Sequence, residues 1–203
     1  MSDRPNPTFT REQALSFLQQ RGITEKIAWL GYRSAGSHYG QYDDTIALLT
    51  PDQYIEYKGN TLPSVWEPGV ASLVPGVYRY KKGLHGIHHL GTGPADKAIL
   101  AWLNGNVGKD YPAGSDKILP YWAFRQAGPV TLQRDGQTGT ETITDPGSPK
   151  WPWIDLHRGG WNGTSSLGCQ TFFPDHWPQA RATGYQAMDR YGLDHILYSL
   201  YQL

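Results

Sequence analysis

The only cysteine of the chain, Cys169, ends the stretch HRGGWNGTSSLGC, which begins with His157. A thiol has an ordinary pKa near 8.5, and a neighbouring imidazole can lower that pKa and hold a thiolate nucleophile. Glycine and small polar residues fill most of the segment between the two side chains. The pattern predicts a Cys–His site for acyl transfer. The alternative is a small buried residue beside an unrelated loop.

Two short strands would bring this pair together. In a strand over 153–157, Asp155 and His157 share a face, because side chains alternate along a strand. If a second strand over 169–173 pairs with the first, Cys169 lies near His157 at the same end. Asp155 could then orient the imidazole as the third member of a triad. It could equally be a buried carboxylate or make a simple turn contact.

Groups next to the cysteine are candidates for stabilising charge. Backbone amides at Gly168 and Cys169 could bind an oxyanion, and a glycine there lets a substrate approach the backbone closely. Ser166 is expected to hydrogen-bond backbone groups near the thiol. Arg158 could bind a carboxylate of the substrate, or be a surface arginine that binds a carbonyl.

The same stretch resembles the active-site motif of the L,D-transpeptidases, cysteine enzymes that act on the peptide stems of peptidoglycan. In that family an upstream histidine leads through a loop to Ser-His-Gly-Cys, then to an aliphatic residue and an arginine. Ser166, Gly168 and Cys169 match, and His157 stands at the upstream histidine. The resemblance implies Cys169 as nucleophile and His157 as base. It also implies a mainly β (α+β) fold with a sandwich or barrel core and a few peripheral helices.

The motif departs from the family at four positions. Leu167 stands where the family has its second histidine, and Gln170 where it has the aliphatic residue. Thr171 replaces the arginine, and Arg158 replaces the glycine after the first histidine. These losses change the expected acceptor site, and hydrolysis is the simplest altered reaction because water only has to replace an amine. We therefore predict an endolysin-like peptidoglycan hydrolase, with cross-linking of stem peptides as an alternative.

Several side chains outside the Cys–His pair are candidates for substrate contact. Aromatic residues that line a groove can stack on sugar rings, although they also fill β cores. The candidates are Tyr78, His88, Arg158, Trp161 and Thr171.

The histidines of the LHGIHHLGTG segment raise the alternative of a metal site. His85 and His88, with His157 as a third ligand, could bind zinc. His88 and His89 are adjacent and would face opposite ways in a strand, and the chain has no HExxH pattern. We expect no metal and no other cofactor.

Two further alternatives leave Cys169 without a catalytic role. A muramidase needs paired carboxylates roughly 5 to 10 Å apart, and Asp155 could pair with Glu141, Asp145 or Asp175. An inactive wall-binding module would keep the fold and have an inert thiol. The cysteine enzyme, in contrast, predicts a low thiol pKa and rapid alkylation.

Composition limits the possible partners. The 18 basic and 18 acidic residues balance, which argues against nucleic acid or an anionic membrane surface as the main partner. The chain has no run of roughly 20 apolar residues that could span a bilayer, and its first residues lack an apolar signal segment. We expect a monomer that is made in the cytoplasm and reaches peptidoglycan after release or export by another system.

The elements that position these residues are mostly strands, as 24 glycines, 15 prolines and 13 tyrosines indicate. We expect one domain over 1–203, with an N-terminal helical extension over about 1–40. A capping box at Thr10 begins a helix that ends at Gly22, and a second helix covers about 175–190. A helical turn is expected over 96–103. Strands are expected over 45–49, 54–57, 77–80, 130–133, 140–144 and 196–201, with breaks at 59–60 and a turn at 81–83.

Overall fold

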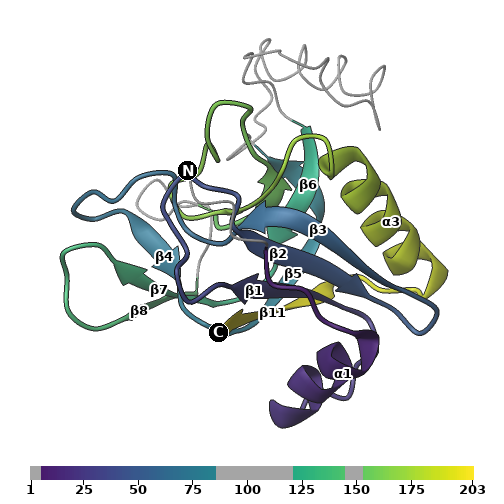
Figure 1. The fold of residues 1–203 in the computed structure, drawn as a ribbon. Helices are drawn as coiled ribbons and strands as arrows, with labels where there is room; N and C mark the ends of the chain where they lie inside the picture. Colours follow the sequence, from purple (N-terminus) through teal and green to yellow (C-terminus); the bar gives the residue numbers. More distant parts are fainter. Residues whose placement is uncertain (1–5, 86–120, 145–152) are drawn as a thin grey trace, which may run out of the picture.

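The computed structural model describes residues 6–85, 121–144 and 153–203. Its main feature is a closed barrel of eight strands in the order β1-β11-β5-β6-β9-β10-β3-β2, beside a three-stranded sheet β4-β7-β8 (Figure 1). The barrel strands are β1 (Ala28–Arg33), β2 (Asp44–Leu49), β3 (Tyr54–Asn60), β5 (Gly76–His85), β6 (Tyr121–Gln126), β9 (Leu156–Arg158), β10 (Gln170–Phe172) and β11 (Ile196–Gln202). The small sheet contains β4 (Ala71–Leu73), β7 (Val130–Arg134) and β8 (Glu141–Ile143). The predicted mainly β (α+β) fold is confirmed.

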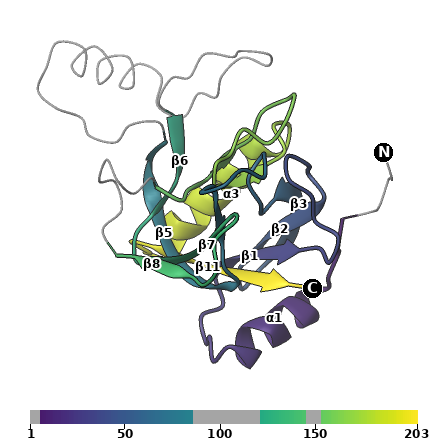
Figure 2. The ribbon, with the colours of Figure 1, turned by 90° about the vertical axis from the view of Figure 1, so that its left-hand side faces the viewer.

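Helix α1 (Arg11–Gln20) begins at the predicted capping box. The Gln13 amide donates to the Thr10 hydroxyl at 3.3 Å, and the Thr10 amide donates to the Gln13 side chain at 2.8 Å. Gly22 follows the helix with a φ of 68°. Ala14 and Leu18 bury α1 against the barrel, where Figure 2 shows it beside β1 and β11.

Strand β1 lies inside the range expected to form a helical extension. Its six residues are all buried. Trp29 packs in the central core, while Leu30 and Tyr32 pack toward α1. A strand buried on both faces has no polar alternation to reveal it, which is why the segment gave no strand signal.

Two expected interruptions are wrong. Strand β3 continues through Gly59 and Asn60, and β5 continues through the expected turn at 81–83. Gly83 pairs with Ala123 of β6, and a Cβ at Gly83 would lie 2.4 Å from the Arg125 Cγ. Gly83 therefore makes room for the Arg125 side chain instead of turning the chain.

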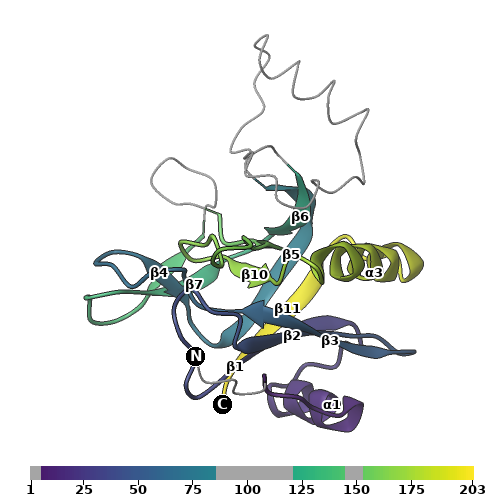
Figure 3. The same ribbon diagram turned by 45° about the horizontal axis from the view of Figure 1, so that its top comes forward.

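The last third of the chain closes the barrel. Helix α3 (Trp177–Arg190) starts with Pro178 in its first turn, as predicted, and β11 then pairs with β1 and β5. A Cβ at Gly184 would lie 2.7 Å from Trp29 and 2.5 Å from Phe124, so only glycine lets α3 approach the core this closely. Figure 3 shows α3 beside the barrel.

The remaining expectations concern two hairpins and one helical turn. The hairpins β2–β3 and β7–β8 are confirmed by their antiparallel pairing. The helical turn over 96–103 lies outside the described residues. Neither helix of the described part combines the length and the apolarity that crossing a membrane requires.

Candidate active site

Strands β9 and β10 pair in parallel and place the two predicted catalytic side chains together. His157 is opposite Thr171 in the register, and Cys169 directly precedes β10. The Gln170 amide donates to the Asp155 carbonyl at 2.9 Å. The Asp155 amide donates to the Cys169 sulfur at 3.3 Å. The expectation that the strands pair across the loop is confirmed.

The turn before the cysteine is held by Ser166. Its hydroxyl donates to the Cys169 carbonyl at 2.7 Å and accepts from the Gly168 amide at 3.0 Å. Gly168 has a φ of 147°, and a Cβ there would lie 2.9 Å from the Ala71 carbonyl oxygen, so the site requires glycine. The predicted role of Ser166 is confirmed. The Gly168 amide already donates to Ser166, which argues against the oxyanion role expected for it.

His157 is buried, with 2% of its surface exposed, and its ring orientation is defined by two groups. Nδ1 lies 2.6 Å from the Arg158 carbonyl oxygen and 2.9 Å from the Tyr121 hydroxyl. A carbonyl oxygen only accepts, so Nδ1 carries the proton and donates it. The Tyr121 hydroxyl donates to the same carbonyl at 3.1 Å. This tautomer leaves Nε2 unprotonated and able to accept a proton.

Asp155 does not orient His157 as the expected triad member. Its fully buried carboxylate lies 2.8 Å from Nδ1 of His85 and 3.2 Å from Nη1 of Arg125. The Gln126 amide donates to its second oxygen at 3.4 Å. The orienting group for His157 is the Arg158 carbonyl, and Asp155 orients His85 instead.

His85 joins the site from the end of β5. It is opposite Tyr121 in the β5–β6 pairing, and its ring stacks on His157 with centroids 3.9 Å apart and planes at 18°. One ligand atom each of His85, His157 and Cys169 lies within 4.8 Å of the other two. We call these three residues the His–Cys cluster.

Burial determines the protonation states of Cys169 and His157. Desolvation, reinforced by the negative charge of Asp155, raises the pKa of the Cys169 thiol to about 12. Desolvation, followed by the charge of His85, lowers the pKa of His157 well below its usual value. The expected low thiol pKa is wrong. Both groups are neutral at pH 7, because a buried thiolate and a buried imidazolium would each lose their solvation.

The predicted substrate contacts differ in accessibility. Tyr78 is buried in the core and donates its hydroxyl to the Val74 carbonyl, and Thr171 is fully buried. Neither residue presents a surface to a substrate, so both expectations are wrong. Trp161 is 39% exposed, and Arg158 is half-buried. His88 lies outside the described residues.

The carboxylates considered for a muramidase lie in different settings. Asp155 is fully buried between His85 and the Arg125 guanidinium. Glu141 forms an ion pair with Arg134 in the small sheet. Asp175 is exposed just before α3, and Asp145 lies outside the described residues.

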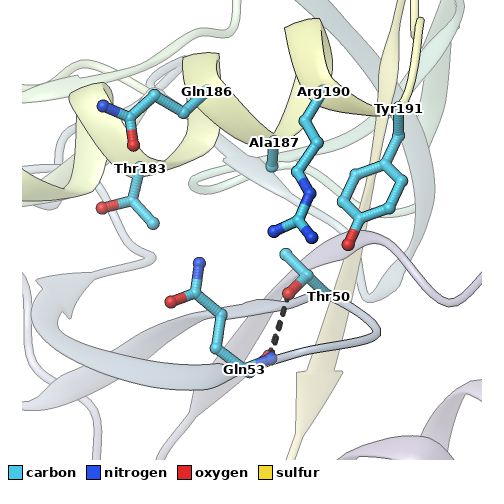
Figure 4. A pocket seen from close by; sticks show the side chains of 7 residues that line it. All are labelled: Thr50, Gln53, Thr183, Gln186, Ala187, Arg190 and Tyr191. Atoms are coloured by element: carbon cyan, nitrogen blue, oxygen red, sulfur yellow. Dashed lines mark hydrogen bonds between the residues drawn. The ribbon is translucent and has the colours of Figure 1, made fainter.

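A second polar region lies between the β2–β3 turn and α3 and has a volume of about 90 Å³. Figure 4 shows Gln53 on one side and Thr183 and Arg190 of α3 on the other. We call it the α3 hollow. Arg190 also forms an ion pair with Asp52 at 2.8 Å, in which both side chains are exposed. Because no cysteine, histidine or carboxylate lines it to activate its hydroxyl groups or to react, the α3 hollow is not a candidate for catalysis.

The sequence patterns did not identify Tyr121 or Arg125, and they suggested His85 only as a zinc ligand or as one of three loop histidines of which one borders the cleft. His85 could have been placed at the site if the strand predicted at 77–80 had been extended through 81–83. The longer strand β5 carries His85 to the end of the barrel where the site lies. Comparison of the chain with protein-family models, with curated proteins and with solved structures found no match.

Proposed function

We propose that this chain is a cysteine-dependent hydrolase that cleaves an amide bond in the peptide part of bacterial peptidoglycan. The observation that carries the proposal is the hydrogen bond from Nδ1 of His157 to the Arg158 carbonyl. That bond directs the basic Nε2 away from the backbone, in a cluster whose ligand atoms lie within 4.8 Å of one another.

The neutral pair supports general-base catalysis without a preformed thiolate. As the sulfur of Cys169 attacks the carbonyl carbon, Nε2 of His157 takes the thiol proton, and the Cys169 amide donates to the developing oxyanion. The imidazolium then gives its proton to the leaving amine, and a thioester remains. Water attacks the thioester with His157 again as base, which releases the carboxylic acid and restores the thiol.

The substrate class rests on the motif shared with the L,D-transpeptidases at Ser166, Gly168 and Cys169, with His157 upstream. Surface features near the loop are compatible with a large substrate, since Trp161 is 39% and Leu167 68% exposed. The Asp155 carboxylate is engaged by His85, Arg125 and the Gln126 amide, which weighs against the muramidase alternative, because a glycosidase acid must reach the glycan oxygen.

The test is mass spectrometry of products from purified sacculi, digested in parallel with the wild type and with Cys169→Ala. We expect peptide fragments with new carboxyl and amino ends from the wild type alone, with circular dichroism showing that the variant folds. The loss in rate should be on the order of 10⁴-fold or more, because the nucleophile is removed. Equal release by both proteins would contradict the proposal, and new reducing sugar ends from both would indicate a glycosidase.

A further inference from the structure

The His–Cys cluster has the donor set of a transition-metal site. Two imidazoles and one thiolate are ligands that zinc prefers, and three protein ligands with an open fourth position are common in zinc sites where the metal contacts an outside molecule. The three ligand atoms lie within 4.8 Å of one another. A zinc ion with bonds of roughly 2.0 to 2.3 Å requires them to approach by about 1 Å.

Hydrogen bonds on the far side of each ring match the surroundings of metal-binding histidines. Such histidines usually donate their second N–H to a carboxylate or a backbone carbonyl, which defines the tautomer and the ring orientation. Nδ1 of His85 lies 2.8 Å from Asp155, and Nδ1 of His157 lies 2.6 Å from the Arg158 carbonyl. Both rings therefore have Nε2 left for a metal ion.

We propose that His85, His157 and Cys169 form a three-ligand zinc site, with Nε2 of each imidazole and the sulfur of Cys169 as ligands and with the fourth position open. Binding forms two Zn–N bonds and one Zn–S bond, and the thiol proton passes to water. The fourth position would hold a water molecule.

The three side chains can approach one another around an ion because Cys169 and His157 are fixed by their surroundings, whereas His85 is partly exposed. The Cys169 sulfur accepts a hydrogen bond from the Asp155 amide, and the Cys169 carbonyl accepts one from the Ser166 hydroxyl. His157 is buried in β9. The His85 side chain is 27% exposed at the end of β5. A zinc ion bound by both rings requires them to leave their parallel stack, and the partly exposed His85 side chain is the one that has room to tilt. Because His157 and Cys169 are buried, an ion would enter on the side of His85.

The zinc site would regulate the hydrolase, and this consequence rests on the proposed function. With zinc in place, the sulfur is bonded to the metal and Nε2 of His157 has no free lone pair. Nucleophile and base are then blocked together. Zinc is therefore expected to inhibit peptidoglycan cleavage reversibly, with activity restored by a chelator.

Cobalt titration tests the site without any substrate. Zn²⁺ is d¹⁰ and gives no absorption of its own, whereas Co²⁺ bound to a thiolate gives a charge-transfer band in the near ultraviolet and visible bands typical of tetrahedral coordination. We expect one Co²⁺ per chain, displaced by one Zn²⁺. The charge-transfer band should vanish in Cys169→Ser, and the affinity should fall at least about tenfold in His85→Ala, which removes a ligand and its oriented ring. His195→Ala, which removes an exposed histidine paired with Asp194, should bind like the wild type.

Each outcome separates the zinc site from the proposed hydrolase. A wild type without the band, or a band equally strong in His85→Ala, would overturn the zinc site, even if sacculi are digested. Tight cobalt binding with the expected variant pattern, in a protein that never cleaves sacculi, would leave the zinc site standing and reject the hydrolase. Circular dichroism of each variant ensures that a lost band does not reflect unfolding.

Discussion

The His–Cys cluster and the α3 hollow both bring polar side chains of distant segments together, yet their surroundings differ. In the cluster, the Asp155 carboxylate is fully buried against an Arg125 side chain that is 7% exposed. Arg190, which lines the α3 hollow, forms an ion pair with Asp52, and 67% and 53% of the two side chains are exposed. One group of charges is held in the barrel wall, and the other lies in solvent.

The difference shows how burial in the barrel determines the charge state of ordinary residues. Water around the α3 hollow solvates each charge and screens the ion pair, so the pair has little energetic weight. Inside the barrel the same residue types must be paired or neutral, because an isolated charge cannot be solvated there. The neutral thiol and imidazole follow from this, and so does the Asp155 carboxylate held between His85 and Arg125.

The largest expected effect tests whether the cluster is catalytic. His157→Ala removes the proposed general base, so digestion of sacculi should slow by roughly 10²- to 10⁴-fold. His195→Ala serves as the matched control on the surface and should digest at the wild-type rate. A His157→Ala protein that folds and digests normally would remove the cluster from consideration as an active site.

The second prediction compares the stability that the two ion pairs provide. Asp155→Ala leaves Arg125 buried without its carboxylate partner, and the free energy of unfolding should fall by about 3 to 5 kcal/mol. Urea denaturation followed by tryptophan fluorescence measures the change. A loss below about 1 kcal/mol would mean that the barrel wall is hydrated and that the contrast between the two regions is weaker than proposed.

The third prediction concerns alkaline pH. The folded-state pKa of Cys169, about 12, lies above the unfolded value of about 8.5, so the folded protein holds a proton that the unfolded chain loses. This contribution to stability is complete below about pH 8.5 and is lost as the pH rises toward the folded value, at about 1 kcal/mol per pH unit. Denaturation at pH 8, 9 and 10 should show a steeper decline for the wild type than for Cys169→Ala. Parallel declines would show that the thiol is solvated.

Alkylation provides an independent measure of the same burial. At pH 7 iodoacetamide should label Cys169 more slowly than a free thiol, because the thiolate is the reacting form and its population is small. The rate should still be rising with pH above 8.5. A plateau below pH 7 would instead indicate a preformed thiolate.

The smallest effect belongs to the α3 hollow. Asp52→Ala removes the partner of Arg190, and the free energy of unfolding should change by less than about 1 kcal/mol. The same urea assay measures it beside Asp155→Ala. A loss as large as that of Asp155→Ala would show that exposure does not distinguish the two ion pairs.

Local patterns in the sequence predicted much of the site and of the fold. The capping box at Thr10, the hairpin around Pro51 and the apposition of His157 with Cys169 were all predictable. The first two depend on turn chemistry and spacing over a few residues, and the third on two short strand patterns joined by a segment of small residues. The two hydrogen bonds of the Ser166 hydroxyl were also predictable, because its partners lie two and three residues away.

Only the tertiary structure decided which groups surround the thiol and in which charge state they are held. His85 reaches Asp155 across 70 positions of sequence, and Arg125 reaches it through the β6–β9 contact. Tyr78 and Thr171 look like groove residues in the sequence and are buried in the structure. Burial and desolvation depend on the packing of distant segments, which no local pattern records. The sequence by itself therefore predicted that Cys169 and His157 lie together, as the proposed nucleophile and base, and the barrel decided that both are neutral.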